Sequence, residues 1–190
     1  MNFLDQFHNE LAPKLGTRAI TFSYMIQQIL QMPHTQIIET GTARAQGNWM
    51  GDGQSTLIWD WIAKIKDLSV LSIDLNQDYI ETARSQTTKV DYLQGDSVYI
   101  LNKLSKDIVR NCGLLYLDSF DLDQRNPIPS AVHHLKELTA VWPLLPRGCM
   151  IVVDDCISDT LGKHIFVKSF FNSIEIKPVF TGYQWGWLKL

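Results

Sequence analysis

The sequence predicts an α/β fold, a sheet of seven mostly parallel strands with helices on both faces and an antiparallel hairpin at the C-terminus. Short apolar runs alternate with longer segments whose apolar residues recur every three or four positions, as in βαβ units. Several runs are continuously apolar, which is typical of strands covered on both faces. The last two runs are joined near Gly182 and Tyr183, and so short a turn can only join antiparallel strands.

Each element follows from a local pattern. The first long helix has an apolar stripe at positions i, i+3, i+4, i+7 and i+8, from Phe22 to Leu30, and Pro33 closes it. The other expected helices cover residues 58–65, 76–86, 98–108, 130–142 and 161–171, with Asn76 as an N-cap. The expected strands are residues 36–39, 70–74, 90–93, 114–118, 149–154, 174–181 and 185–190. This is a Rossmann-like arrangement.

Composition limits the class of protein. The chain has 190 residues, 45% of them hydrophobic and 19% charged, which suits one domain over residues 1–190, with a helical cover over 1–33 and a core over 36–190. No apolar stretch is long enough to span a membrane, and no secretory leader opens the chain, so a cytoplasmic protein is expected. The net charge of −3 and the lack of a basic run argue against a nucleic-acid partner. Cys112, Cys149 and Cys156 are expected to be reduced core thiols.

Acidic residues stand where the predicted parallel strands end. In an open parallel sheet, ligands bind beyond the carboxyl ends of the strands. A rim of this charge suits a cation, ribose hydroxyls or a divalent metal better than phosphates. The alternative is that these carboxylates cap the following helices. The residues are Glu39, Asp74, Asp96 with Ser97, Asp118, Asp154 and Asp155.

The stretch from Gly41 to Gly53 indicates which class of cofactor the protein binds. It contains neither the G-x-G-x-x-G of a dinucleotide site nor a Walker-type G-K-[ST]. Asp74 ends the second expected strand, where an acid can accept hydrogen bonds from both ribose hydroxyls. The pattern therefore favours a ligand that contains a nucleoside but is not held by its phosphates.

The ordered set of motifs resembles class I S-adenosylmethionine-dependent methyltransferases, and most closely the metal-dependent O-methyltransferases of the catechol and macrocin types. The resemblance runs from about Ile37 to the C-terminus, and the terminal hairpin is typical of that fold. The motifs are Glu39-Thr40-Gly41, Gly53-Gln54-Ser55, Ser72-Ile73-Asp74-Leu75-Asn76, Gly95-Asp96-Ser97, Leu117-Asp118 and Val153-Asp154-Asp155.

The resemblance implies roles for individual residues in binding S-adenosylmethionine. Gly41, Thr42 and the turn from Gly53 to Ser55 would lie against the methionine part, with Ser55 near its carboxylate. Glu39 would face the amino group or a neighbouring water, and Asp118 would border the cofactor. Asp74 would hold the ribose, while Asp96 and Ser97 would flank the adenine.

The resemblance also implies a divalent metal. Asp118, Asp154 and Asp155 match the positions that bind the cation in catechol-type enzymes, and carboxylate oxygens suit Mg²⁺. Such an ion would lower the pKa of a bound substrate hydroxyl. The alternative is that Asp154 and Asp155 merely end a strand.

Two features depart from the family pattern. Where catechol-type enzymes place a lysine base, this sequence has Asp121, so the base is open among His133, His134, Lys163 and His164. The long loop from Ala43 to Asp52 carries Arg44, which could pair with an acidic substrate or with the rim carboxylates.

The leading hypothesis is methyl transfer to a hydroxyl of a small molecule. The sequence Leu117-Asp118-Ser119-Phe120 differs from the Asp/Asn-Pro-Pro-Tyr type of enzymes that methylate nucleic-acid bases. The alternatives are a nicotinamide-dependent oxidoreductase and a non-catalytic protein that binds S-adenosylmethionine. In this family, N-terminal helices often cover the substrate or form a dimer face, so a homodimer is one expectation. Sugar, phenol and hydroxy-acid acceptors all stay open.

Overall fold

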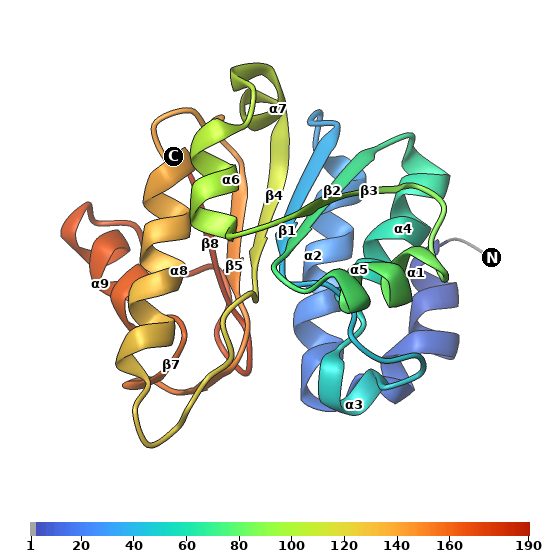
Figure 1. Cartoon of the computed structure of the whole chain (residues 1–190), viewed down its shortest axis with the longest axis horizontal. Helices are drawn as coiled ribbons and strands as arrows, with labels where there is room; N and C mark the ends of the chain where they lie inside the picture. Colours follow the sequence, from blue (N-terminus) through green and yellow to red (C-terminus); the bar gives the residue numbers. More distant parts are fainter. Residues whose placement is uncertain (1–2) are drawn as a thin grey trace.

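The computed structural model describes residues 3–190, and the protein has three layers (Figure 1). A six-stranded sheet has the order β3-β2-β1-β4-β5-β8, and only β8 runs antiparallel to its neighbour. The strands are β1 (Gln36–Thr40), β2 (Ser69–Asp74), β3 (Val90–Gln94), β4 (Cys112–Leu117), β5 (Met150–Val153) and β8 (Trp185–Leu188). The predicted fold class is confirmed, with six strands in place of seven.

Alternate residues of the central strands pack into two hydrophobic cores, because successive side chains of a strand point to opposite faces of the sheet. Ile38 and Leu115 belong to the core under α6 (Ser97–Lys103), α8 (Ile128–Val141) and α9 (Ile165–Ser173). Ile37 and Leu114 belong to the core under α1 (Phe3–Gln6), α2 (Ala19–Gln31) and α4 (Ser55–Lys66). Both faces are buried, which explains the continuous apolar runs in the sequence.

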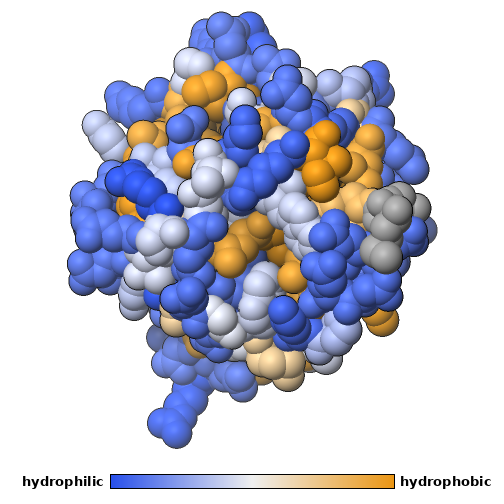
Figure 2. Space-filling model, turned by 90° about the vertical axis from the view of Figure 1, so that its right-hand side faces the viewer, coloured by the Kyte–Doolittle hydropathy of each residue, from blue (hydrophilic) through white to orange (hydrophobic). Residues whose placement is uncertain are grey.

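The segment before β1 covers one face of the sheet, where Phe7, Phe22 and Met25 are buried in the same core as Trp59 of α4. Short π and 3₁₀ turns, Phe7–Leu11, Ala12–Lys14 and Gly16–Arg18, lead from α1 into α2. Figure 2 shows the side of the molecule that faces right in Figure 1, where hydrophobic residues form separate patches among hydrophilic ones. Within residues 3–190, no helix is long and apolar enough to cross a membrane.

Three element predictions were wrong. Residues 174–181 do not form a strand, because the backbone N–H groups of residues 174–176 bond to the end of α9 and only a single bridge, Phe180 to Gly186, follows. The expected helix over 98–108 is broken at Ser105, whose hydroxyl caps α7 (Lys106–Arg110). Residues 161–162 form β7 (Leu161–Gly162), which pairs with β6 (Cys156–Ser158) before α9 begins.

Other local predictions are confirmed. The Asn76 side chain accepts a hydrogen bond from the backbone N–H of Asp78 at 2.8 Å and caps α5 (Gln77–Arg84). All three cysteines are free and buried. The loop after β1 contains one helical turn, α3 (Trp49–Asp52), which lies near the carboxyl ends of the parallel strands (Figure 1).

Candidate active site

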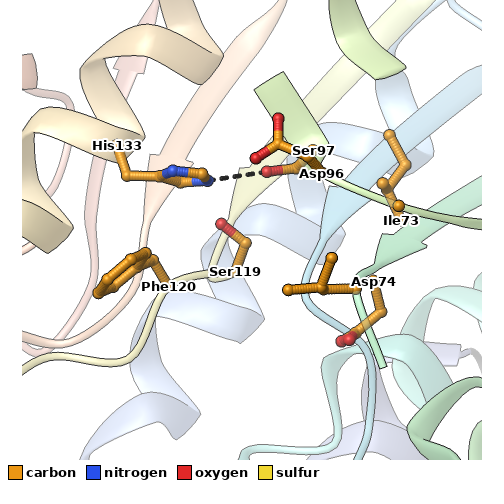
Figure 3. Close-up of a pocket in the computed structure, with 9 residues that line it drawn as sticks. Ile73, Asp74, Asp96, Ser97, Ser119, Phe120 and His133 are labelled. Carbon is orange, nitrogen blue, oxygen red and sulfur yellow. Dashed lines mark hydrogen bonds between the residues drawn. The ribbon is translucent and has the colours of Figure 1, made fainter. Parts of the chain in front are cut away.

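Two hollows lie at the carboxyl ends of the parallel strands. The first, here called the β2/β4 cavity, has a volume of about 200 Å³ (Figure 3). It is lined by Ile73, Asp74, Leu75, Gly95, Asp96, Ser97, Ser119, Phe120 and His133. The second, the acidic pocket, has a volume of about 260 Å³ and is lined by Arg18, Arg44, Asn48, Gly51, Asp52, Asp118, Asp121 and Asp155. Asp118 and Ser119 are adjacent in the chain, so the two hollows are neighbours.

Asp74 enters the β2/β4 cavity with its carboxylate fixed in place. One oxygen accepts the backbone N–H of Thr42 at 2.9 Å, and the other accepts that of Asn76 at 2.8 Å. A carboxylate has about four acceptor positions, so each oxygen keeps one for a ligand. Asp96 is exposed and uses one oxygen to cap α6 through the N–H of Tyr99, which leaves the other oxygen open. Both predicted nucleoside-binding acids therefore line one cavity.

A buried polar network forms the opposite wall of this cavity. Glu137 has no exposed surface, and it accepts hydrogen bonds from the hydroxyls of Ser97 and Ser119. His133 contacts the Ser97 hydroxyl at 2.9 Å, with Phe120 beside it (Figure 3). Burial alone would raise the pKa of Glu137, but the bonds from His133 and the serines outweigh it and lower the pKa to about 2. The wall therefore carries a fixed negative charge behind polar side chains.

Glu39 lines neither the β2/β4 cavity nor the acidic pocket. Its carboxylate is fully buried and accepts hydrogen bonds from Ser55 at 2.6 Å, Thr56 at 2.7 Å and Ser72 at 2.8 Å. The Ser55 hydroxyl is used on Glu39, and the expected contact of Glu39 with a ligand amino group or a neighbouring water stays a prediction. Thr56 also holds the backbone N–H of Ala43 at 3.0 Å, so this cluster fixes the loop after β1.

Gly41 allows the backbone of that loop to approach β4. Its φ is +81°, and a Cβ at this position would lie 2.4 Å from the carbonyl oxygen of Asp118. Only glycine fits such a conformation and contact. Gly53 also has a positive φ, and it packs beside the Arg18 side chain rather than in the β2/β4 cavity.

Glu39 gives a test of pH dependence. Burial raises its pKa to about 7 despite the three hydroxyl donors. The folded state then binds the proton more tightly than the unfolded state, so stability from this group falls as pH rises from about 4.5 to about 7. The loss is on the order of 3 kcal/mol for a shift of this size. We expect Glu39→Gln to remove this slope in urea denaturation between pH 5 and pH 8; parallel curves for both proteins would contradict it.

Asp118 and Asp155 line the acidic pocket, and Asp154, the third predicted metal ligand, is buried. Two cations already pair with these three side chains. The ammonium of Lys163 lies 2.5 Å from Asp118 Oδ1 and 3.0 Å from Asp155 Oδ2. The Arg18 guanidinium lies 3.1 Å from Asp154 Oδ2 and 3.5 Å from Asp155 Oδ1. In residues 3–190, no group of three His, Cys, Asp or Glu side chains is arranged to hold a metal ion. The expected Mg²⁺ ligand set of Asp118, Asp154 and Asp155 is therefore not a metal site as folded.

Three of the four base candidates have no exposed surface. Lys163 is fully buried, and the charges of Asp118 and Asp155 outweigh its burial and raise its pKa, so it stays protonated. Burial lowers the pKa of His134 to about 4, and its ring is held on the Ser130 carbonyl. His164 has no exposed surface, and its ring centroid lies 4.6 Å from that of Trp185. His133 faces the β2/β4 cavity, not the acidic pocket.

Sequence reasoning missed Arg18 and Glu137. Arg18 comes from the segment before α2, and its isolated basic side chain gives no pattern that pairs it with Asp154, 136 residues away. Glu137 sits on the buried stripe of α8, and a charged residue among apolar helix positions was the available signal. Arg44 binds Asp121 at 2.5 Å and 3.0 Å, and Asp121 is not one of the rim carboxylates with which Arg44 was expected to pair.

The fold is that of class I S-adenosylmethionine-dependent methyltransferases. CalS11, a calicheamicin methyltransferase, superposes with a TM-score of 0.64 over 97% of this chain and 84% of its own, at 13% identity. MycE, a mycinamycin methyltransferase in complex with Mg, SAH and mycinamycin VI, gives 0.67 over 99% of this chain and 53% of its own, at 12% identity. The O-methyltransferase NovP gives 0.52 over 87% and 78%, at 14% identity. No family model matches the sequence, and no curated protein matches it.

Proposed function

We propose that the protein transfers the methyl group of S-adenosylmethionine to a hydroxyl of a small molecule. The observation that carries the proposal is a cavity edged by Asp74 and Asp96 beside a charged pocket, both at the carboxyl ends of the parallel strands. Proteins of the same fold support the choice of donor and acceptor: MycE binds SAH, and CalS11 is described as a TDP-rhamnose 3'-O-methyltransferase. We also propose that nucleic acid is not an acceptor, in line with the net charge of −3.

In this proposal the adenosine part of the donor fills the β2/β4 cavity. Asp74 accepts hydrogen bonds from the ribose hydroxyls, because its two backbone bonds aim the carboxylate without using all its acceptor positions. The open oxygen of Asp96 accepts from the adenine amino group. The Gly41 loop, which passes close to β4, then directs the methionine part and its sulfonium toward Asp118.

The acceptor would bind in the acidic pocket with its hydroxyl near Asp118 and Asp155. Its oxygen forms a bond to the methyl carbon while the carbon–sulfur bond breaks, and the hydroxyl proton passes to a carboxylate or to water. Alignment supplies most of the rate, because the sulfonium is already a strong electrophile. Arg18 and Lys163 hold the carboxylates in place.

Calorimetry with SAH and NADH is the first test, followed by transfer of labelled methyl groups to sugar, phenol and hydroxy-acid acceptors. We expect SAH to bind more tightly than NADH and at least one hydroxyl compound to be methylated. Tighter binding of NADH would favour an oxidoreductase and overturn the proposal. Binding of SAH without transfer to any acceptor would favour a non-catalytic binding protein.

A further inference from the structure

The carboxyl groups at the acidic pocket are already paired with two basic side chains of the protein itself. Asp118, Asp154 and Asp155 are three carboxyl groups, and the ammonium of Lys163 and the guanidinium of Arg18 lie 2.5–3.5 Å from their oxygens. Lys163 and Asp154 are almost completely buried. Buried charges persist only when they are paired, so each of these groups depends on the others.

The local fold is built to bring Lys163 back to this cluster. The β6–β7 hairpin reverses the chain directly after Asp155, and the backbone N–H of Lys163 donates to the Asp155 carbonyl at 3.2 Å. Gly162 makes this return possible, because a Cβ there would lie 2.7 Å from the same carbonyl oxygen at a φ of +148°. Asp155 itself adopts a positive φ of 52°. The lysine is therefore placed by its backbone as well as by its charge.

We propose that the ammonium of Lys163 takes the place of a divalent cation between Asp118 and Asp155, so that methyl transfer by this protein needs no metal. This inference rests on the proposed function and concerns how the same site is organised. Arg18 takes the third carboxylate, Asp154, which leaves a cation no free set of oxygen ligands. Lys163 is a positioning residue here, because it has no exposed surface through which to touch an acceptor.

The proposal predicts that removal of the ammonium restores a cation site. In Lys163→Ala, Asp118 and Asp155 lose their partner and gain the space that the side chain filled. Two carboxylates with water in the remaining positions suit Mg²⁺. We therefore expect Lys163→Ala to bind Mg²⁺ and Mn²⁺ in calorimetry in the millimolar range or tighter, while wild type gives flat traces. Removal of a lysine with a purely structural role would not produce this gain of metal binding.

Control variants separate charge from packing. Lys163→Met fills the space without a charge and is expected to bind no Mg²⁺, whereas Lys163→Arg keeps a cation and should behave as wild type. Lys168→Ala removes the next lysine of the chain, which pairs with Asp159 at the surface, and should also match wild type. Failure of a folded Lys163→Ala to bind either metal would overturn the proposal.

The wild-type protein gives a test that does not depend on any variant. We expect EDTA to change its methyl transfer by less than about twofold, since no metal supplies the charge at the site. Tight Mg²⁺ binding by wild type, or loss of transfer in EDTA, would overturn the inference about Lys163 but leave the proposed reaction standing. Absence of SAH binding would instead overturn the proposed function itself.

Discussion

Arg18→Met is expected to lower the free energy of unfolding by about 3–5 kcal/mol, the usual cost of leaving one partner of a buried ion pair alone. The guanidinium binds Asp154, whose side chain is 1% exposed, and it also stacks on the Tyr183 ring at 4.3 Å. Methionine keeps an apolar stem of similar length, so the main change is the lost charge. Urea denaturation at pH 7 measures the effect.

Two variants test whether charge is the cause. Arg147→Met removes an exposed arginine and should change stability by no more than about 0.5 kcal/mol. Arg18→Met with Asp154→Asn removes both charges of the pair and should recover more than half of the loss, because Tyr116 still donates to residue 154. A loss below about 1 kcal/mol in the single variant would show that Asp154 is held without Arg18.

Periodicity predicted the elements well because each core strand and helix carries its burial pattern locally. The alternation of Ile37 and Ile38 between two cores, and the apolar stripe of α2, are properties of a few neighbouring residues. The failures occur where local composition is ambiguous. Residues 174–181 are rich in strand formers, but the first of them bond back to the end of α9 and a single bridge remains. Edge strands of this kind depend on partners that a local pattern does not contain.

The site could be predicted only in part, for a related reason. The position of Asp74 and Asp96 follows from strand order, since both acids end or follow parallel strands that meet at one edge. The pairing of Lys163 and Arg18 with the acidic cluster does not follow from strand order, because both contacts join residues far apart in the chain. Three carboxylates without visible cations look like a metal site; the same carboxylates with two buried cations do not.

Asp74→Ala is expected to weaken SAH binding by about 100-fold, which corresponds to about 3 kcal/mol for hydrogen bonds from two hydroxyls to a charged group. The carboxylate borders the β2/β4 cavity, and its backbone bonds to Thr42 and Asn76 keep it aimed there. Asp91→Ala, on an exposed position of β3, should bind SAH as wild type does. Calorimetry on both variants measures the difference, and thermal unfolding shows whether the fold is intact. Unchanged affinity in a folded Asp74→Ala would mean that the nucleoside of the donor lies elsewhere on the molecule.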